Sequence, residues 1–145
     1  MITLKEQHKG YEKYRDSQVE WIGNLPVDWK IKRLKYATKI NPEKLSEETK
    51  PDWILNYIDV GNVDSNGNIT GSEEYGFSNS PSRARMKIRN GDTIISTVRT
   101  YLKAIGFIQN AQDNLIVSTG FAVLRPNQEI LPEFLWKMIS SYRYI

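Results

Sequence analysis

The amino-acid sequence predicts an α+β fold, a single domain with about six short strands and two or three helices. Its 145 residues are the usual length of one domain. The apolar segments are short, rich in Ile, Val and aromatic residues, and separated by turn residues, which is typical of strands. They do not alternate regularly with helical patterns, so repeated βαβ units are not expected. We expect one mixed, mostly antiparallel and strongly twisted sheet.

The first half of the chain contains two predicted strands and one short helix. Alternating apolar and charged residues at 29–32 predict a strand, and the apolar spacing at 34–38 predicts one or two helical turns. Residues 53–63 are rich in Ile, Val and Tyr and predict a second strand, which the Asn-Gly pair at 66–67 closes as a turn. Residues 70–82 are expected to form an exposed loop.

Four further strands and a helix are predicted in the second half. The strands are expected at 84–88, 93–98, 105–108 and 114–126, and Pro at the end of the last one halts it because it cannot donate to a sheet. Residues 132–139 predict a helix, with Pro and Glu in its first turn and an apolar face of Phe134, Leu135, Met138 and Ile139.

The chain opens with a polar lead-in over residues 1–20, which is expected to be partly helical or disordered. Trp21, Trp29 and Trp53 are expected in the core.

Composition excludes several classes of protein. The chain has no Cys and one His, His8, so disulfides and thiolate metal sites are excluded and a zinc site is not expected. No apolar run approaches the ~18 residues of a membrane span, and the polar start lacks a signal-peptide core. We therefore expect a cytoplasmic protein with no metal, no cofactor and no membrane association.

Charge is segregated along the chain, although the net charge is only +3. Residues 43–76 contain eight acidic and two basic residues, whereas residues 83–103 contain six basic and one acidic. Such segregation steers a polyanion to one surface, but ordinary solvated faces also produce it. A second basic cluster at 30–39 is expected to be a solvated helix.

The groups that catalysis requires are missing from the sequence. No glycine-rich loop with G-x-G spacing is present to hold a nucleotide or S-adenosylmethionine. The carboxylates lie in a solvated loop rather than in a cluster that holds Mg²⁺, and no catalytic His or Cys is available for triad chemistry. The sequence therefore favours binding over catalysis, and we expect that the chain is not an enzyme.

The segment "STVRTYLKAIGFI" (96–108) places long polar-tipped side chains between two apolar stretches. Arg99, Tyr101 and Lys103 occupy alternating positions, with Thr97 before them. If the segment is a strand, they line one face. If its middle is a loop, they lie at the edge of a sheet. In both arrangements an anion, or only water, can occupy the site.

Five blocks of sequence form a set whose order and spacing rarely recur by accident. They are "YRDSQVEWIGNLPVDWKIKRLKYAT" (14–38), "YIDVGNV" (57–63), "SRARMKIRNGDTIISTVRTYLKAIGFI" (82–108), "STGFAVLRP" (118–126) and "PEFLWKMI" (132–139). Together they resemble the amino-terminal target recognition domain in the specificity subunit of type I restriction–modification enzymes. The resemblance covers nearly the whole chain from Tyr14, and it implies a recognition domain at 14–145 after a polar lead-in at 1–13.

The resemblance implies a function and partners. Such subunits carry two recognition domains joined by long helices, and each domain reads one half of a split double-stranded DNA site. The specificity subunit is non-catalytic: modification (methyltransferase) subunits methylate adenine, and restriction subunits join the complex indirectly. The given chain is expected to hold one recognition domain and to stop near the start of the connecting helix.

The resemblance also implies which residues contact DNA. The predicted contacts lie in two basic segments, and they are Ser82, Arg83, Arg85, Lys87, Thr97, Arg99, Tyr101 and Lys103. Arg99 is the expected base reader, because a guanidinium pairs bidentately with guanine, and Lys103 is the expected phosphate contact.

Other interpretations of these residues remain open. Tyr101 can equally be an aromatic at the edge of the core, and residues 82–87 can be a solvated basic turn. Thr119 and Gly120 are interpreted as structural. As a whole, the chain can be a protein-interaction fragment whose apolar face at 134–139 docks another chain or a second copy of itself. A small RNA-binding β-domain is disfavoured, because the aromatic-rich strand motifs of common RNA modules are absent.

Overall fold

The computed structural model describes residues 10–100 and 103–141, and the chain divides into two compact units, Met1–Arg33 and Leu34–Ile145. In the first unit a short antiparallel hairpin joins β1 (Tyr14–Asp16) to β2 (Asn24–Pro26). Its connection contains two residues of positive φ, Gln18 at 59° and Gly23 at 70°. The sequence predicted turns here and did not predict the two strands.

Two tryptophans of the first unit are exposed, so their predicted place in the core is wrong. Trp21 is 43% exposed and Trp29 is 38% exposed. Leu25 is the one large aliphatic side chain that is buried in the described part of this unit. A unit of this length cannot build a core that covers two indoles. Trp53, in the second unit, is partly buried against a hydrophobic cluster.

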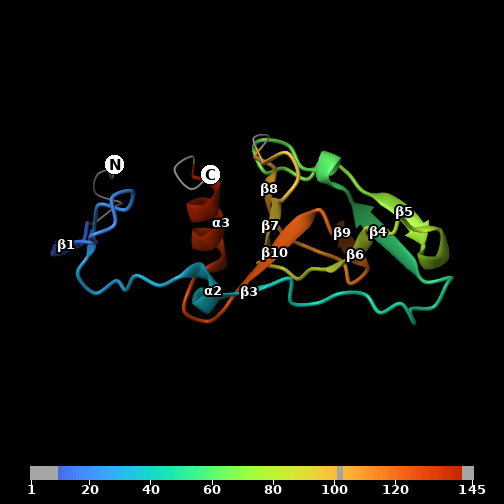
Figure 1. Ribbon diagram of the computed structural model, residues 1–145, viewed down its shortest axis with the longest axis horizontal. Helices are drawn as coiled ribbons and strands as arrows, with labels where there is room; N and C mark the ends of the chain where they lie inside the picture. The colour runs from blue at the N-terminus through green and yellow to red at the C-terminus, as the bar shows by residue number, and fades with distance from the viewer. Residues whose placement is uncertain (1–9, 101–102, 142–145) are drawn as a thin grey trace, which may run out of the picture. The chain divides into compact units, whose positions relative to one another are not determined.

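The first four-stranded sheet of the second unit is entirely antiparallel and has the order β3–β10–β7–β8. Its strands are β3 (Thr38–Ile40), β10 (Phe121–Pro126), β7 (Thr93–Ser96) and β8 (Ile105–Phe107). Helix α3 (Pro132–Ser140) lies beside this sheet in Figure 1. Its Leu135 and Ile139 are buried in one cluster with Ile105 and Leu124.

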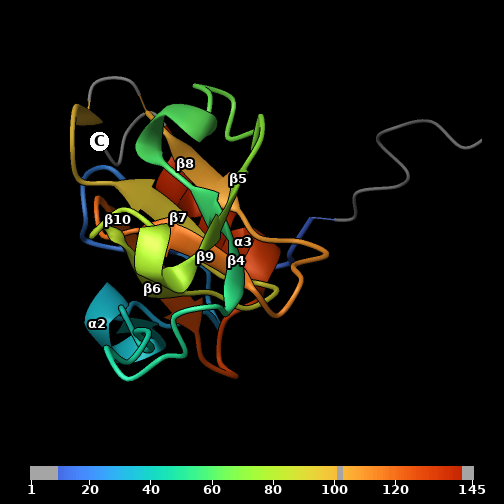
Figure 2. The ribbon, with the colours of Figure 1, turned by 90° about the vertical axis from the view of Figure 1, so that its right-hand side faces the viewer.

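The second four-stranded sheet has the order β5–β4–β9–β6 (Figure 2). Its strands are β5 (Glu73–Gly76), β4 (Ile54–Ile58), β9 (Leu115–Ser118) and β6 (Ala84–Lys87). The central pair β4 and β9 is parallel, and the two outer pairings are antiparallel. The sheet is therefore mixed.

A two-residue turn connects the two sheets. β9 ends at Ser118 in the second sheet and β10 begins at Phe121 in the first, with Thr119 and Gly120 between them. The sequence predicted one strand over 114–126, because both halves are apolar. The structure has two strands in two sheets, and one core cluster contains Val117 from β9 and Val123 from β10.

Three short helices of the second unit, α2, η1 and η2, lie wholly within the described residues. Helix α2 (Leu34–Ala37) leads directly into β3, and the strand predicted at 29–32 is absent. Two 3-10 turns follow β4 and β5, namely η1 (Val60–Asn62) and η2 (Phe77–Asn79). Helix α3 begins at Pro132, as the sequence predicted, with Glu133 in its first turn. None of the helices in the described ranges is long and apolar enough to cross a bilayer.

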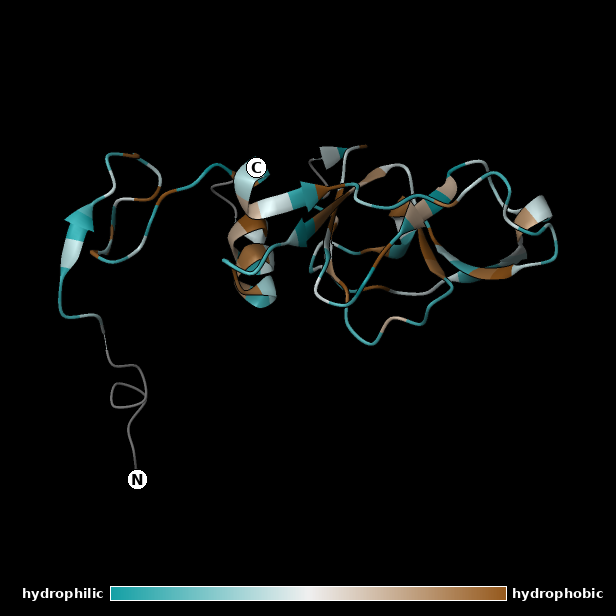
Figure 3. Ribbon diagram, turned by 90° about the horizontal axis from the view of Figure 1, so that it is seen from below, coloured by the Kyte–Doolittle hydropathy of each residue, from teal (hydrophilic) through white to brown (hydrophobic). Residues whose placement is uncertain are grey.

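The predicted α+β class is confirmed, with more strands than expected. The described residues form ten short strands in three sheets, mostly antiparallel, where about six strands in one sheet were expected. Strand β5 lies in the segment 70–82 that was expected to be a loop. Hydrophobic residues are concentrated in the strands and in α3, as Figure 3 shows. The limits of 14–145 for a recognition domain stay a prediction, because they are defined by function.

The predicted Asn-Gly turn is present and is tied to the first sheet. The Asp64 carboxylate accepts hydrogen bonds from the amides of Asn66 and Asn68, each at 2.9 Å, and these amides hold its pKa below the usual range. Gly67 has φ +81°, and a Cβ there would lie 2.4 Å from the carbonyl oxygen of Ile105. Only glycine fits such a backbone approach.

Candidate nucleic-acid interface

The connection between β7 and β8 is a loop, which decides between the two arrangements left open by the sequence. β7 ends at Ser96, whose hydroxyl donates to the carbonyl of Val98 and accepts from its amide at 3.2 Å. Arg99 and Lys103 have positive φ, 51° and 52°, and no strand maintains that conformation. Both are exposed. Tyr101 lies outside the described residues.

The start of this loop is fastened to the turn between β9 and β10. The amide and the hydroxyl of Thr97 both donate to the carbonyl oxygen of Gly120, at 2.9 and 3.0 Å. The amide of Gly120 in turn donates to the hydroxyl of Ser118 at 3.0 Å. Gly120 is buried, and a Cβ there would lie 3.0 Å from a methyl group of Val60. The β9–β10 turn is thus closely packed and hydrogen-bonded to its neighbour.

The same turn also holds the loop before β6. The amide of Thr119 donates to the carbonyl oxygen of Arg83 at 2.8 Å. Ser82 and Arg83 are exposed in this loop. Burial raises the pKa of the nearby Tyr57 phenol, which donates to Asp59 at 3.2 Å, while the Arg83 charge acts in the opposite direction. Arg83 therefore lies within electrostatic reach of Tyr57.

Five of the predicted DNA contacts thus belong to two loops that meet at one turn. We call this set the cationic edge: Ser82, Arg83, Thr97, Arg99 and Lys103. Neither Arg83 nor Arg99 makes an ion pair with any residue in the described ranges. Their exposed guanidinium groups are available to an anion.

Arg85 lies on β6 and its guanidinium is occupied within the protein. It donates to a carboxylate oxygen of Glu47 at 3.0 Å, to the hydroxyl of Ser80 at 3.2 Å and to the carbonyl of Ala84 at 2.9 Å. It also lies over the ring of Phe77, 4.4 Å from the centroid. These contacts favour a structural role for Arg85.

Lys87 ends β6 and is half-buried. Its amide donates to the carbonyl of Glu43 at 3.1 Å, so this end of the strand lies beside residues 43–45. The structure does not bring Arg85 and Lys87 to the cationic edge, although the sequence placed them in one set with Arg83.

In the folded chain, residues of the basic segment form ion pairs with residues of the acidic segment. Arg85 pairs with Glu47, and Arg89 pairs with Glu43, each at 3.0 Å. Both acidic residues come from the acidic segment 43–76. They can reach the basic residues because residues 43–45 run beside β6. Arg83 and Arg99, on the cationic edge, take no part in these ion pairs among the described residues.

A partly buried ionic network links three segments that are distant in sequence. Arg125 on β10 makes two hydrogen bonds to the Asp92 carboxylate, at 3.0 and 2.9 Å, and one to Glu43 at 2.6 Å. The Asp92 carboxylate also accepts from the amide of Arg89 at 2.8 Å. The hydrogen bond from Arg125 holds the pKa of Glu43 below its usual range. No local pattern in the sequence predicts this network, because its members lie far apart along the chain.

The sequence analysis also missed the role of the residues that join the loops. Thr119 and Gly120 were interpreted as structural, which agrees with their hydrogen bonds, but nothing linked them to Arg83 or Thr97. Their signal was a small polar pair, Thr-Gly, inside a long apolar stretch. Asp59 caps η1 by accepting from the amide of Val60 at 2.8 Å, and that signal is an Asp before a turn.

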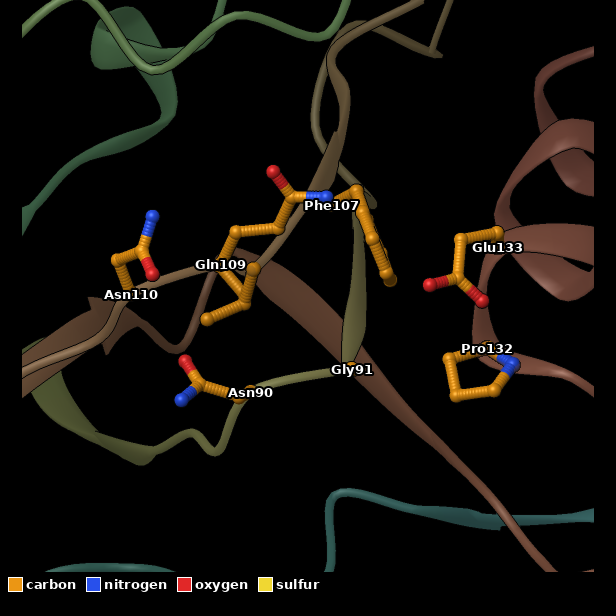
Figure 4. Close-up of a pocket in the computed structure, with 8 residues that line it drawn as sticks. Asn90, Gly91, Phe107, Gln109, Asn110, Pro132 and Glu133 are labelled. Carbon is orange, nitrogen blue, oxygen red and sulfur yellow. The ribbon is translucent and has the colours of Figure 1, made fainter.

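A shallow depression of about 370 Å³ lies elsewhere, between the end of β8 and the start of α3. Figure 4 shows Glu133 on one side of Phe107 and the side-chain amides of Asn90 and Asn110 on the other. None of the predicted DNA contacts lines it. Among the described residues, no group of three or more His, Cys, Asp or Glu is placed to hold a metal ion.

Comparison with known proteins gives the same family as the sequence blocks. No protein-family model matches the chain. It is 30% identical over 115 residues to the type I restriction enzyme HindI specificity subunit of Haemophilus influenzae, which covers 79% of this chain and 24% of that relative. The chain thus spans about a quarter of the length of this curated relative.

Solved structures agree in fold and sequence. The HsdS subunit of Thermoanaerobacter tengcongensis superposes with a TM-score of 0.70 at 39% identity, over 77% of this chain and 29% of that one. A second structure, from work on complex assembly and conformational transition of the type I R-M system, gives a TM-score of 0.73 at 38% identity. It covers 81% of this chain and 30% of that one. The chain is therefore a homologue of the type I restriction enzyme specificity subunits over roughly four-fifths of its length.

Proposed function

We propose that this chain is a non-catalytic, sequence-specific recognition module for duplex DNA. It would read one half of a bipartite site and direct adenine methylation and restriction by partner subunits. The observation that carries the proposal is the cationic edge: two separate loops, both hydrogen-bonded to the Thr119–Gly120 turn, carry exposed guanidinium groups on a chain homologous to specificity subunits. Such subunits supply the specificity of the complex and leave catalysis to other components.

The two kinds of cation on the cationic edge have different tasks in this proposal. Arg83 and Arg99 carry planar forks that match the O6 and N7 acceptors of guanine in the major groove. Lys103 is a point charge suited to a phosphate oxygen, which fixes position without reading sequence. Thr97 is expected near the DNA, although its hydroxyl already donates to Gly120.

Duplex binding by the isolated chain is expected to be weak and strongly dependent on salt. Each neutralised phosphate contributes a slope of roughly −0.9 to a plot of log affinity against log salt concentration. With about four phosphates engaged, the slope is expected to be roughly −3 to −4. Fluorescence anisotropy with a labelled duplex at several salt concentrations measures it. A slope near zero contradicts the electrostatic model, and failure to enrich any motif from a random duplex library contradicts sequence reading.

A second candidate is a protein-interaction fragment with little DNA binding of its own. It is favoured by the exposed apolar residues at the start of α3, where Leu131 is 72% exposed and Phe134 42% exposed. Exposed apolar patches commonly mark interaction surfaces. Modification subunits, or a second copy of this chain, are the partners in this case. Sedimentation velocity of the purified chain, alone and with modification subunit, separates this candidate from the first.

A further inference from the structure

We propose that the Thr119–Gly120 turn is a positioning element that holds the Arg83 loop and the Arg99 loop in one fixed arrangement, with Thr97 as its key positioning residue. The inference rests on the proposed function, since the arrangement matters only if both loops read one ligand. Thr97 was predicted to contact DNA, and this inference gives it a different task. Its hydroxyl acts within the protein.

Thr97 makes two hydrogen bonds to the same acceptor. The carbonyl oxygen of Gly120 accepts both from the amide of Thr97 at 2.9 Å and from its hydroxyl at 3.0 Å. The hydrogen bond from the Thr97 amide would by itself join the end of β7 to the turn. The second bond also fixes the Thr97 side chain, and therefore the direction in which the loop leaves β7 toward Arg99.

The turn is held from the other side as well. The Thr119 amide reaches the carbonyl of Arg83 at 2.8 Å, so neighbouring residues of a two-residue turn bind both loops. Ser118, which is fully buried, accepts from the Gly120 amide at 3.0 Å and hydrogen-bonds to Tyr57. The turn therefore cannot shift without disturbing β4, and it supplies a rigid spacer between the two arginines.

A rigid spacer affects discrimination more than attraction. Base reading depends on guanidinium groups that meet donor and acceptor positions set by the duplex, whereas attraction to phosphate tolerates displacement. Loosening the Arg99 loop is thus expected to weaken the cognate complex and to leave scrambled DNA nearly unaffected. A purely structural role for Thr97 would instead lower thermal stability without changing the ratio of the two affinities.

The test compares three threonine variants of the chain. Thr97→Val keeps the shape and removes the hydroxyl, Thr97→Ser keeps the hydroxyl, and Thr100→Val changes an exposed threonine of the same loop whose hydroxyl has no partner among the described residues. Dissociation constants are measured for a duplex enriched by the wild-type chain and for a scrambled duplex. Melting temperature and salt slope are recorded for each variant.

Thr97→Val is expected to reduce the ratio of the two affinities by about 3- to 10-fold, the loss of one ordinary hydrogen bond. Affinity for the scrambled duplex and the salt slope are expected to be unchanged, and Thr97→Ser and Thr100→Val are expected to keep the wild-type ratio. Amide hydrogen exchange is expected to be faster at residues 97–100 in Thr97→Val, which can be measured even if binding is weak.

Three results would overturn the inference in distinguishable ways. If the wild-type chain discriminates and Thr97→Val keeps the full ratio, Thr97 does not position the loop, and the proposed function stands. If the wild-type chain does not discriminate at all, the proposed function fails and this inference fails with it. A parallel loss of affinity for both duplexes in Thr97→Val also overturns it, because that result assigns the hydroxyl to phosphate binding.

Discussion

Replacing Arg125 with Met is expected to lower the free energy of unfolding by about 3–5 kcal/mol, because it leaves a buried carboxylate without its charged partner. Asp92 is 1% exposed and receives two of the three hydrogen bonds that the Arg125 guanidinium donates. After the substitution it would retain the amide of Arg89. A domain of this size has a total stability of about 5–15 kcal/mol, so the loss is large. Urea denaturation measures it.

Arg89→Met is the matched control. The Arg89 side chain is 66% exposed and makes one ion pair, with Glu43. Exposed pairs of this kind contribute at most about 1 kcal/mol. If Arg125→Met is no more destabilising than Arg89→Met, the network of Arg125, Asp92 and Glu43 does not contribute to holding these three segments together.

The same substitution has a pH signature. The pKa of Glu43 is lowered in the folded chain, chiefly by Arg125, so its ionised form stabilises the fold. This contribution is present above the unfolded pKa, which lies near 4.5, and it is lost as the pH falls through the lower folded pKa. As the pH falls through this range, the free energy of unfolding is therefore expected to decrease less in Arg125→Met than in the wild type. Thermal melts from pH 6 to pH 3 measure the difference.

Arg99→Ala is expected to weaken the complex with the enriched duplex by about 1–3 kcal/mol and to leave binding to scrambled DNA nearly unchanged. Arg99 is exposed, has positive φ and makes no ion pair with a described residue, so its substitution removes no internal ion pair in this part of the structure. Paired dissociation constants on the two duplexes measure the effect, with thermal melts of each variant.

Lys103→Ala and Lys50→Ala are the comparisons for Arg99→Ala. Lys103→Ala is expected to weaken both duplexes alike and to reduce the salt slope by about one unit, since a phosphate contact carries no sequence information. Lys50 is exposed and lies outside the cationic edge, so its substitution is expected to change neither value. Wild-type binding by Arg99→Ala would show that the β7–β8 loop does not face the bases.

Sequence patterns predicted the elements whose signals are local. Turn chemistry identified the Asn66-Gly67 turn, and a proline with a following glutamate marked the start of α3. Strand β5 was missed because its two glutamates and glycine resemble a loop, although as an edge strand it pairs only with β4. The β9–β10 break was missed because the apolar pattern continues through it, and only long-range pairing assigns the two halves to different sheets.

In the candidate site too, local sequence predicted which residues are exposed but not which distant residues they contact. Arg83 and Arg99 were chosen from their neighbours in sequence, and both are exposed. Arg85 was chosen for the same reason, but alternation along β6 directs it to Glu47 and Phe77. Glu47 is 38 residues away from Arg85 in the chain, so no local pattern identifies the pair. The hydrogen bonds of Gly120 to Thr97 are equally non-local.

Amide hydrogen exchange of the wild-type chain, with and without the enriched duplex, tests whether DNA lies against the two loops joined by the Thr119–Gly120 turn. We expect slower exchange on DNA binding at residues 82–83, 97–100 and 119, with no change in the exposed edge strand β5 (Glu73–Gly76). Unchanged exchange in all three segments, or protection confined to α3, would contradict it.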